Sequence, residues 1–264
     1  MPTIEHHCPG QPVAGYRAAS LLMAQALRID ARCGQPQPLV GVGHADELEA
    51  ALGALGLRAP SPVLALVGGA SGLDPEVSGR LLSLFETLCP WLDRFNATVV
   101  DGGTAYGVMA LVGQARRNSK ARFPLLGVAA ARTVARPGSD DRGAALDPNH
   151  THILLVPGTR WGDESIWISD VAQTLACGLP SLTLVAGGGE VTRIDVINGL
   201  RARRPLLVIS GSGGTADALA RWHRGGAQLP GAQFGAAERD LIEVVDLDRA
   251  TRELPGLLLR TLAV

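Results

Sequence analysis

The sequence has no long apolar run and no excess of either charge, and each absence excludes a class of protein. No apolar run approaches the roughly 20 residues that a bilayer-spanning helix needs, so we expect no membrane partner. Lys and Arg number 24 against 25 Asp and Glu. The chain therefore lacks the overall positive field that holds a long nucleic acid by releasing its counterions, and we expect no nucleic-acid polymer as a partner.

Cysteines are also few. Cys8, Cys33, Cys89 and Cys177 lie far apart and form no CxxC pair, and the first residues show no basic-then-apolar signal segment. We therefore expect a cytoplasmic protein, because the reducing cytoplasm is the default compartment for such a chain. Cys89 and Cys177 lie in or beside apolar helical patterns, which favours buried packing thiols over nucleophiles.

Tyrosine is rarer still, and its scarcity bears on one kind of enzyme. The run ALVGGASGL at 65–73 looks like the cofactor turn of short-chain dehydrogenases. Those enzymes use a Tyr-x-x-x-Lys pair, but Tyr16 and Tyr106 are followed four positions later by Ser20 and Ala110. Without a proton-donating pair the reduction has no acid, so a dehydrogenase is disfavoured.

Glycine, by contrast, is abundant, at 33 of 264 residues against a usual frequency of about 7%. The glycines cluster directly after short apolar runs, in GGASG, DGGTAYG, GGGE and GSGGT. This placement is typical of turns that follow strands rather than of a flexible linker. The length allows a substantial core, and we expect one domain over residues 36–264, preceded by an N-terminal arm over 1–35 with a short helix near 18–27.

Eight short apolar runs predict β-strands. Most of them are continuous rather than alternating, which suits strands covered on both faces, as in a parallel sheet flanked by helices. The runs are 38–42, 63–67, 98–100, 124–128, 152–156, 181–185, 205–209 and 241–245.

Helical patterns fill the gaps between these runs, and the clearest begins at Asp74 as N-cap with Pro75 in the first turn. The predicted helices are 74–91, 104–116, 164–176, 190–202, 215–223 and 248–262. This alternation predicts an α/β, Rossmann-like fold, with an open, mostly parallel sheet and helices on both faces. A closed eight-fold barrel is the competing architecture, and we favour the open sheet because several glycine-rich turns open straight into helices.

Two early turns are candidate ligand contacts. Glycines allow positive φ angles and close backbone approach, and the helix that follows adds free N–H groups and the favourable end of its dipole. Both turns are therefore expected to face a phosphate-bearing ligand, with a tight turn that holds no ligand as the alternative. The residues are Gly68, Gly69, Ala70 and Ser71 in the first turn, and Gly102, Gly103, Thr104, Gly107 and Val108 in and after the second.

Two later turns repeat the pattern after strong strands. Their small residues leave room for phosphate or ribose oxygens, and Asp217 could accept a hydrogen bond from a ribose hydroxyl. Each turn could also be free of ligand, but four such turns in one open sheet favour a shared crevice. The residues are Gly188, Gly189 and Glu190 in one turn, and Gly211, Ser212, Gly213, Gly214, Thr215 and Asp217 in and after the other.

The polar segment between the early and late turns offers two further candidates. Arg160 is suited to clamp a phosphate and Trp161 to stack on a base. The alternative is a surface loop in which Asp163 or Glu164 caps the next helix. His150 and His152 have a spacing that could begin a metal site, but spacing places no third ligand, so we predict no metal.

Taken together, these motifs resemble the SLOG superfamily, and within it the bacterial LSDAT-type domains that are similar to the cytosolic N-terminal domain of melastatin-type TRP channels. The match runs over about residues 37–246. The resemblance implies a Rossmann-like domain that senses or processes nucleotide-derived ligands such as ADP-ribose, its cyclic relatives or NAD, in bacterial signalling or defence. The residues that carry it are LVGGASG at 66–72, VVDGGTAYGVMALVGQA at 99–115, NHTHILLVPG at 149–158, WGDES at 161–165 and GSGGTADALA at 211–220.

The same superfamily contains phosphoribohydrolases with a PGGxGTxxE signature, and this chain departs from it. The corresponding stretch is SGSGGTADA, in which Ala218 replaces the glutamate. Asp217 and Glu190 remain candidate catalytic carboxylates. We therefore predict a ligand sensor that needs no cofactor and binds an ADP-ribose-like or other adenine nucleotide, with a nucleotide N-glycosidase or a pure interaction protein as alternatives. The resemblance also implies a possible homo-oligomer.

Overall fold

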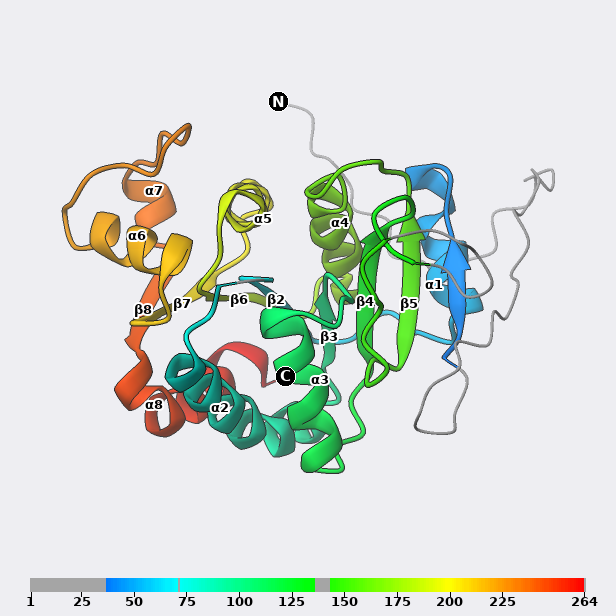
Figure 1. Ribbon diagram of the computed structural model, residues 1–264, viewed down its shortest axis with the longest axis horizontal. Coiled ribbons are helices and arrows are strands. Elements are labelled where there is room, and N and C mark those ends of the chain that lie inside the picture. Colours follow the sequence, from blue (N-terminus) through cyan, green and yellow to red (C-terminus); the bar gives the residue numbers. More distant parts are fainter. Residues whose placement is uncertain (1–36, 71, 136–142, 264) are drawn as a thin grey trace.

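The computed structural model describes residues 37–70, 72–135 and 143–263. The expected N-terminal arm, its short helix and Ser71 lie outside the described residues. The chain forms one open sheet of eight parallel strands, in the order β1-β5-β4-β3-β2-β6-β7-β8 (Figure 1). The strands are β1 (Leu39–Gly41), β2 (Val63–Gly68), β3 (Thr98–Asp101), β4 (Leu125–Ala130), β5 (His152–Val156), β6 (Ser181–Ala186), β7 (Leu206–Ser210) and β8 (Ile242–Asp246).

The strands form where the apolar runs predict them, because helices cover both faces of the sheet. In β2, Leu64 and Leu66 pack into the core on one face, whereas Val63 and Ala65 pack into the core on the other. Successive strand residues point to opposite faces, so a strand buried on both sides is apolar throughout. The predicted α/β architecture with an open sheet is confirmed, and the barrel is excluded because β1 and β8 stand at opposite ends of the order of the described strands and do not pair with each other.

Two sets of helices cover the sheet. One face carries α2 (Pro75–Arg94), α3 (Gly107–Asn118) and α8 (Leu247–Leu262), which share a core. The other face carries α1 (Leu48–Ala54) and α4 (Ser165–Ala176) over one half, and α5 (Glu190–Arg201) and α6 (Gly214–His223) over the other. The structure also has a short 3-10 helix, η1 (Ala45–Glu47), and a one-turn helix, α7 (Ala236–Arg239).

The helix signals in the sequence were strongest for α2. The Asp74 carboxylate accepts hydrogen bonds from the backbone of Glu76 at 2.8 Å and Val77 at 3.4 Å, and Pro75 is the first helical residue. The helix continues beyond the predicted end to Arg94. We did not predict α1, although Leu48, Ala51 and Leu52 are buried at helical spacing, because its seven residues give too short a pattern.

The predicted packing role of the cysteines holds for one of the two. Cys89 lies buried in α2, and burial raises the pKa of its thiol to about 11. The prediction was wrong for Cys177, the residue that ends α4 in a left-handed conformation, because it is disulfide-bonded.

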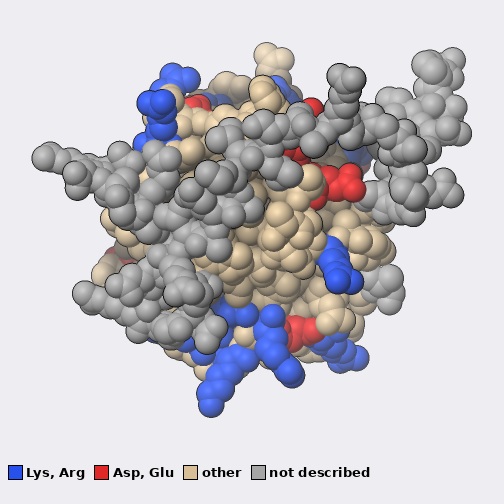
Figure 2. All heavy atoms as spheres, turned by 90° about the vertical axis from the view of Figure 1, so that its right-hand side faces the viewer, with Lys and Arg blue, Asp and Glu red and all other residues tan. Residues whose placement is uncertain are grey.

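None of the described helices combines the length and the apolar character that crossing a bilayer would require. On the face turned toward β1, Lys and Arg side chains gather at the lower end, and uncharged residues fill most of the described centre (Figure 2). The visible described surface there has no continuous basic band of the kind that follows a phosphate backbone.

The order of the strands changes direction between β2 and β6. From β2 the chain proceeds through β3 and β4 to β5, then returns to place β6 on the other side of β2. The helix after β2 lies on one face and the helix after β6 lies on the opposite face. Ligands of open α/β sheets bind in the crevice that forms at the carboxyl ends of the strands at such a point.

Candidate functional site

The glycine-rich turns meet at the carboxyl edge of the sheet and bond directly to one another. Gly69, after β2, donates its N–H to the carbonyl of Ala186 in β6 at 3.2 Å. The Gly69 carbonyl in turn accepts from the N–H of Val108 in α3 at 3.0 Å. The turns after β2 and β3 and the end of β6 are therefore fixed relative to one another.

The turns after β6 and β7 are joined in the same way. Gly187 donates its N–H to the Ser212 hydroxyl at 2.8 Å. Thr215 donates its N–H to the Gly188 carbonyl and its hydroxyl to the Gly189 carbonyl, both at 2.8 Å. Gly214 has φ +52°, and a Cβ there would overlap the Gly188 carbonyl oxygen. Ser212 and Thr215 therefore hold the β6 turn in place.

A cavity of about 240 Å³ opens at this edge, over the end of β2. One wall comes from the end of β2, the turn after β3 and the start of α3. The other wall comes from the loop after β5, from α4 and from the first turns of α5. The lining residues are Leu66, Val67, Gly68, Ala70, Gly102, Thr104, Met109, Trp161, Glu164, Ile168, Gly189, Glu190, Val191, Thr192 and Asp195.

The N-terminus of α5 supplies the donor-rich part of this cavity. Gly189 is its N-cap and provides no capping side chain. Within the described part of the chain, the backbone N–H groups of Gly188, Gly189, Glu190 and Val191 donate no hydrogen bond. Such free amides, together with the positive end of the helix dipole, make a helix N-terminus an anion-binding site.

The ligand-binding residues predicted from the sequence differ in where the structure places them. Those in the cavity wall are Gly68, Ala70, Gly102, Thr104, Trp161, Gly189 and Glu190. Those that shape or support the turns without lining the cavity are Gly69, Gly103, Gly107, Val108, Gly188, Gly211, Ser212, Gly213, Gly214, Thr215 and Asp217, and Arg160 lies exposed on the loop that carries Trp161. Ser71 lies outside the described residues.

The two candidate catalytic carboxylates already have partners. Asp217 accepts from the backbone N–H of Gly211 at 2.6 Å, so it closes the turn after β7. Glu190 forms an ion pair with Arg193 one turn along α5, and its side chain is largely exposed at the cavity rim. Neither carboxylate is therefore free to act without breaking a contact that it already makes.

Two other carboxyl groups, which the sequence did not indicate as catalytic, are buried in the cavity wall. Asp195 in α5 and Glu164, just before α4, line the cavity and are buried, with exposures of 9% and 6%. Asp195 Oδ1 has no hydrogen-bond partner among the described residues. Burial, with a smaller contribution from Glu164, raises the pKa of Asp195 to about 7, although the nearby Ser165 hydroxyl favours the charged form.

Glu164 is shifted in the same direction by a similar cause. Burial raises the pKa of Glu164, with a further contribution from the Asp163 charge, against the effect of backbone hydrogen bonds. Both of its carboxylate oxygens accept from the N–H of Gly162 at 3.1 Å. One sequence pattern could have drawn attention to Asp195. Asp195 falls on the buried stripe of α5 together with Thr192 and Val196, where an unpartnered acid is unusual.

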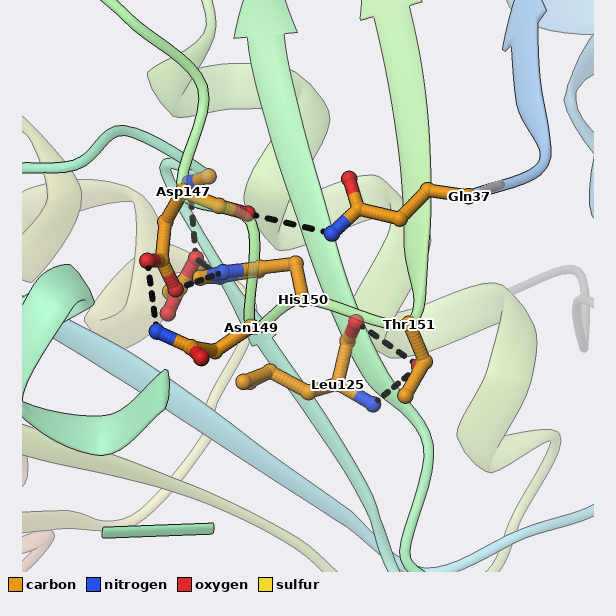
Figure 3. A network of polar contacts seen from close by, with 8 residues as sticks. Gln37, Leu125, Asp147, Asn149, His150 and Thr151 are labelled. Atoms are coloured by element: carbon orange, nitrogen blue, oxygen red, sulfur yellow. Dashed lines mark hydrogen bonds and ion pairs between the residues drawn. The ribbon is translucent and has the colours of Figure 1, made fainter. Parts of the chain in front are cut away.

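A buried ion network lies beneath the turn after β3 (Figure 3). The ring of His150 lies between two carboxylates, with Nε2 at 2.7 Å from Asp101 Oδ1 and Nδ1 at 2.8 Å from Asp147 Oδ2. Asp101 Oδ1 also accepts from the N–H of Gly103 at 2.7 Å. The network therefore ties the glycine turn to the segment that precedes β5.

The charge state of His150 follows from these two partners. Burial alone would lower the pKa of His150, but the Asp101 charge and the hydrogen bonds to Asp101 and Asp147 outweigh it and raise the pKa to about 9. The ring is thus a cation with both nitrogens in use, whereas Nδ1 of His152 contacts the Thr151 hydroxyl instead. The two histidines share no partner among the described residues, and the absence of a metal stays a prediction.

Comparisons with known proteins agree with this architecture. A family model described as SLOG in TRPM, prokaryote, matches residues 61–255. The chain is 25% identical over 205 residues to transient receptor potential cation channel subfamily M member 2 of Mus musculus, covering 63% of this chain and 14% of that protein. A subfamily M member-like 2 protein of Nematostella vectensis is 26% identical over 204 residues, covering 62% and 13%. The chain therefore spans only a small part of the length of these relatives.

One solved structure is similar over most of the chain. It is the molybdenum cofactor binding protein from the phototrophic bacterium Rippkaea orientalis, with a TM-score of 0.50 and 10% sequence identity. The similarity covers 76% of this chain and 99% of that one. At this identity the likeness concerns the fold alone, and it agrees with a Rossmann-like α/β sheet.

Proposed function

Because the chain belongs to the prokaryotic family described as SLOG in TRPM, we propose that it binds a nucleotide-derived ligand of the ADP-ribose type in the cavity at the carboxyl edge of its sheet. The observation that carries the proposal is the uncapped N-terminus of α5, where Gly189, Glu190 and Val191 have free N–H groups and line a cavity at the point where the strand order changes direction. A phosphate accepts hydrogen bonds from such amides without needing a cationic side chain.

The rest of the cavity suits the other parts of such a ligand. Leu66, Met109 and Ile168 give it an apolar wall, and the half-exposed Trp161 offers an aromatic surface on which a base can stack. A pocket for a whole drug-sized ligand occupies about 300–1,000 Å³. The observed cavity is somewhat smaller, so it takes a nucleoside-sized portion, and the phosphates lie over the turn after β6.

The binding proposal is tested by thermal unfolding of the protein with ADP-ribose, NAD and AMP, each at millimolar concentration. We expect a concentration-dependent rise in Tm for at least one of the three, because a ligand that binds only the folded state stabilises it by mass action. Calorimetric titration then gives the stoichiometry, for which we expect one site per chain. A Tm that none of the nucleotides changes would make the proposal wrong.

A second candidate is hydrolysis of an N-glycosidic bond, and Glu164 favours it. The residue lines the cavity with a raised pKa, as expected of a group that exchanges a proton during catalysis. In this reaction water adds to the anomeric carbon, the bond to the base breaks, and the base leaves with a proton. Release of base from AMP or NAD that is lost in Glu164→Gln supports hydrolysis. Stabilisation without release assigns the site to binding alone.

A further inference from the structure

The cavity wall has an unusual charge pattern for a site that receives a phosphate ester. Its titratable members are three carboxyl groups, on Glu164, Glu190 and Asp195, and its described lining includes no Lys, Arg or His. The free amides lie at the α5 end, beside Glu190, and the carboxylate of Glu190 is paired with Arg193. The two buried acids lie together elsewhere in the wall, where an anion would be repelled.

The two buried acids differ in how many hydrogen bonds their oxygens accept from the rest of the protein. Glu164 accepts hydrogen bonds from the Gly162 amide and keeps acceptor capacity on both oxygens. Asp195 has one oxygen with no partner in the described part of the chain, although the residue is more than nine-tenths buried. A buried acceptor without a partner is costly to the fold. A hydroxyl donor on a ligand in the cavity would supply the missing partner of Asp195.

We propose that Asp195 and Glu164 form a sugar subsite, which accepts hydrogen bonds from the ribose hydroxyls of the ligand and orients it with the sugar inward and the phosphates at the α5 N-terminus. The inference rests on the proposed nucleotide-binding function. An ionised carboxylate accepts bonds from hydroxyl donors at close range, as acidic residues do for the ribose in many dinucleotide sites. A ribose diol is also uncharged, so it enters an acidic part of the cavity without repulsion.

The surroundings of Asp195 determine how it responds to pH. Glu164 faces it from the segment before α4. On its own helix, Glu190 and Arg193 neutralise each other, and Asp163 is engaged by the backbone of the loop after β5. The lining residues from β2, the β3 turn and α3 carry no titratable group. Asp195 and Glu164 are therefore the groups whose ionisation the sugar would change.

The consequence is proton release on binding. Free Asp195 has a pKa of about 7, and hydroxyl donors that bond to the carboxylate lower the pKa of the complex. The affinity then rises with pH and levels off above pH 7. Each unit of difference between the free and bound pKa values changes Kd about tenfold. Asp195→Asn keeps the shape of the side chain and removes the ionisation.

The test is calorimetric titration of ADP-ribose into wild type and Asp195→Asn at pH 6, 7 and 8, in two buffers with different ionisation enthalpies. We expect wild type to bind about tenfold more tightly at pH 8 than at pH 6 and to release protons at pH 7, while Asp195→Asn binds with a clearly smaller pH slope. Asp170→Asn is the matched control, since Asp170 is a partly buried acid on α4 that does not line the cavity. It should keep the wild-type slope.

The sugar is tested separately with AMP and 2′,3′-dideoxy-AMP. Loss of the diol should weaken binding to wild type at pH 8 and change binding to Asp195→Asn much less. Binding of ADP-ribose with the same pH slope in both proteins overturns the sugar subsite while leaving the proposed function intact, as does equal affinity for the two AMP forms. Failure of every nucleotide to bind wild type at any pH overturns the proposed function and the subsite with it.

Discussion

Gly107, the first residue of α3, lies directly against Gly69 in the turn after β2. A Cβ on Gly107 would overlap the Gly69 carbonyl oxygen, and the residue has φ +51°. The same carbonyl accepts the N–H of Val108 at 3.0 Å. The start of α3 is thus held against the β2 turn at a distance that only a glycine allows, and one wall of the cavity depends on this contact.

The first prediction is that Gly107→Ala lowers the free energy of unfolding by about 1–3 kcal/mol, because the methyl group must push the two turns apart and the backbone is strained. Urea denaturation followed by circular dichroism measures the change. Gly79→Ala in α2 is the control, since no atom lies within 4 Å of a Cβ placed there. It should be neutral or stabilising by about 0.4–1 kcal/mol, and an equal loss in both variants would contradict the close-contact explanation.

The second prediction concerns His150 and pH. Its folded pKa of about 9 lies above the ordinary value of 6.5, so its contribution to stability is complete below pH 6.5 and is lost as pH rises toward 9. His150→Gln removes the cation and leaves two buried carboxylates, which should cost about 3–5 kcal/mol at neutral pH. Urea denaturation at pH 6, 7.5 and 9 should show that the difference in free energy of unfolding between wild type and variant becomes smaller as pH rises.

His152→Gln serves as the matched control for this series. His152 is half-buried, contacts Thr151 and has no carboxylate partner among the described residues. The free energy of unfolding of His152→Gln should differ from that of wild type by less than about 1 kcal/mol at each pH. If the difference in free energy of unfolding between wild type and His150→Gln does not change with pH, the His150 ring is neutral in the fold. The ion network would then not account for the loss of stability.

The third prediction is a gain in stability from a mutation in the proposed site. Burial raises the pKa of Asp195 from 3.8 to about 7. Between these two pH values the unfolded chain loses the proton more readily than the folded protein does, so the free energy of unfolding falls as pH rises. Asp195→Asn should therefore be more stable than wild type at pH 8, by on the order of 1–3 kcal/mol. The difference should vanish near pH 4, where both side chains are neutral, and a less stable variant at pH 8 would count against the environment assigned to Asp195.

The fourth prediction assigns Trp161 to the ligand rather than to the fold. The side chain is 53% exposed and lines the cavity, so Trp161→Ala should leave Tm nearly unchanged. It should weaken ADP-ribose binding roughly tenfold, or about 1.4 kcal/mol, because stacking on a base is lost. Ile166→Ala is the control, since Ile166 is 51% exposed on α4 but lies outside the cavity wall. Equal affinities of both variants for ADP-ribose would argue against stacking.

The fold could be predicted because its signals are local and repeated. An apolar run such as 181–185 is continuous since helices cover both faces of β6, and Asp74 and Pro75 mark the start of α2 in any context. The order of the strands could not be deduced in this way. Which strand lies beside β2 depends on contacts between residues far apart in the sequence, and no local pattern encodes them.

The candidate site was predicted in part, for a similar reason. Gly68, Gly102 and Gly189 could be selected because each lies at or just after the end of an apolar run that predicts a strand, and all three reach the cavity. Asp217 could not be distinguished from Asp195 by sequence. Both are helical acids, and only the packing shows that the Asp217 carboxylate closes a turn while Asp195 is buried in the cavity wall. Pairing of charges and burial are properties of the folded chain.

The pairing of β2 with β6 also governs when the cavity comes into existence. Gly68 lies beside Ala186 in the sheet, so the two walls are synthesised at widely separated times. On a ribosome, the turns after β2 and β3 emerge long before Trp161 and Asp195, and domains complete their long-range contacts only when the last partner strand is available. A nascent chain therefore lacks the complete cavity until β6 has joined the sheet, and a ligand that needs both walls could not guide the folding of the first half.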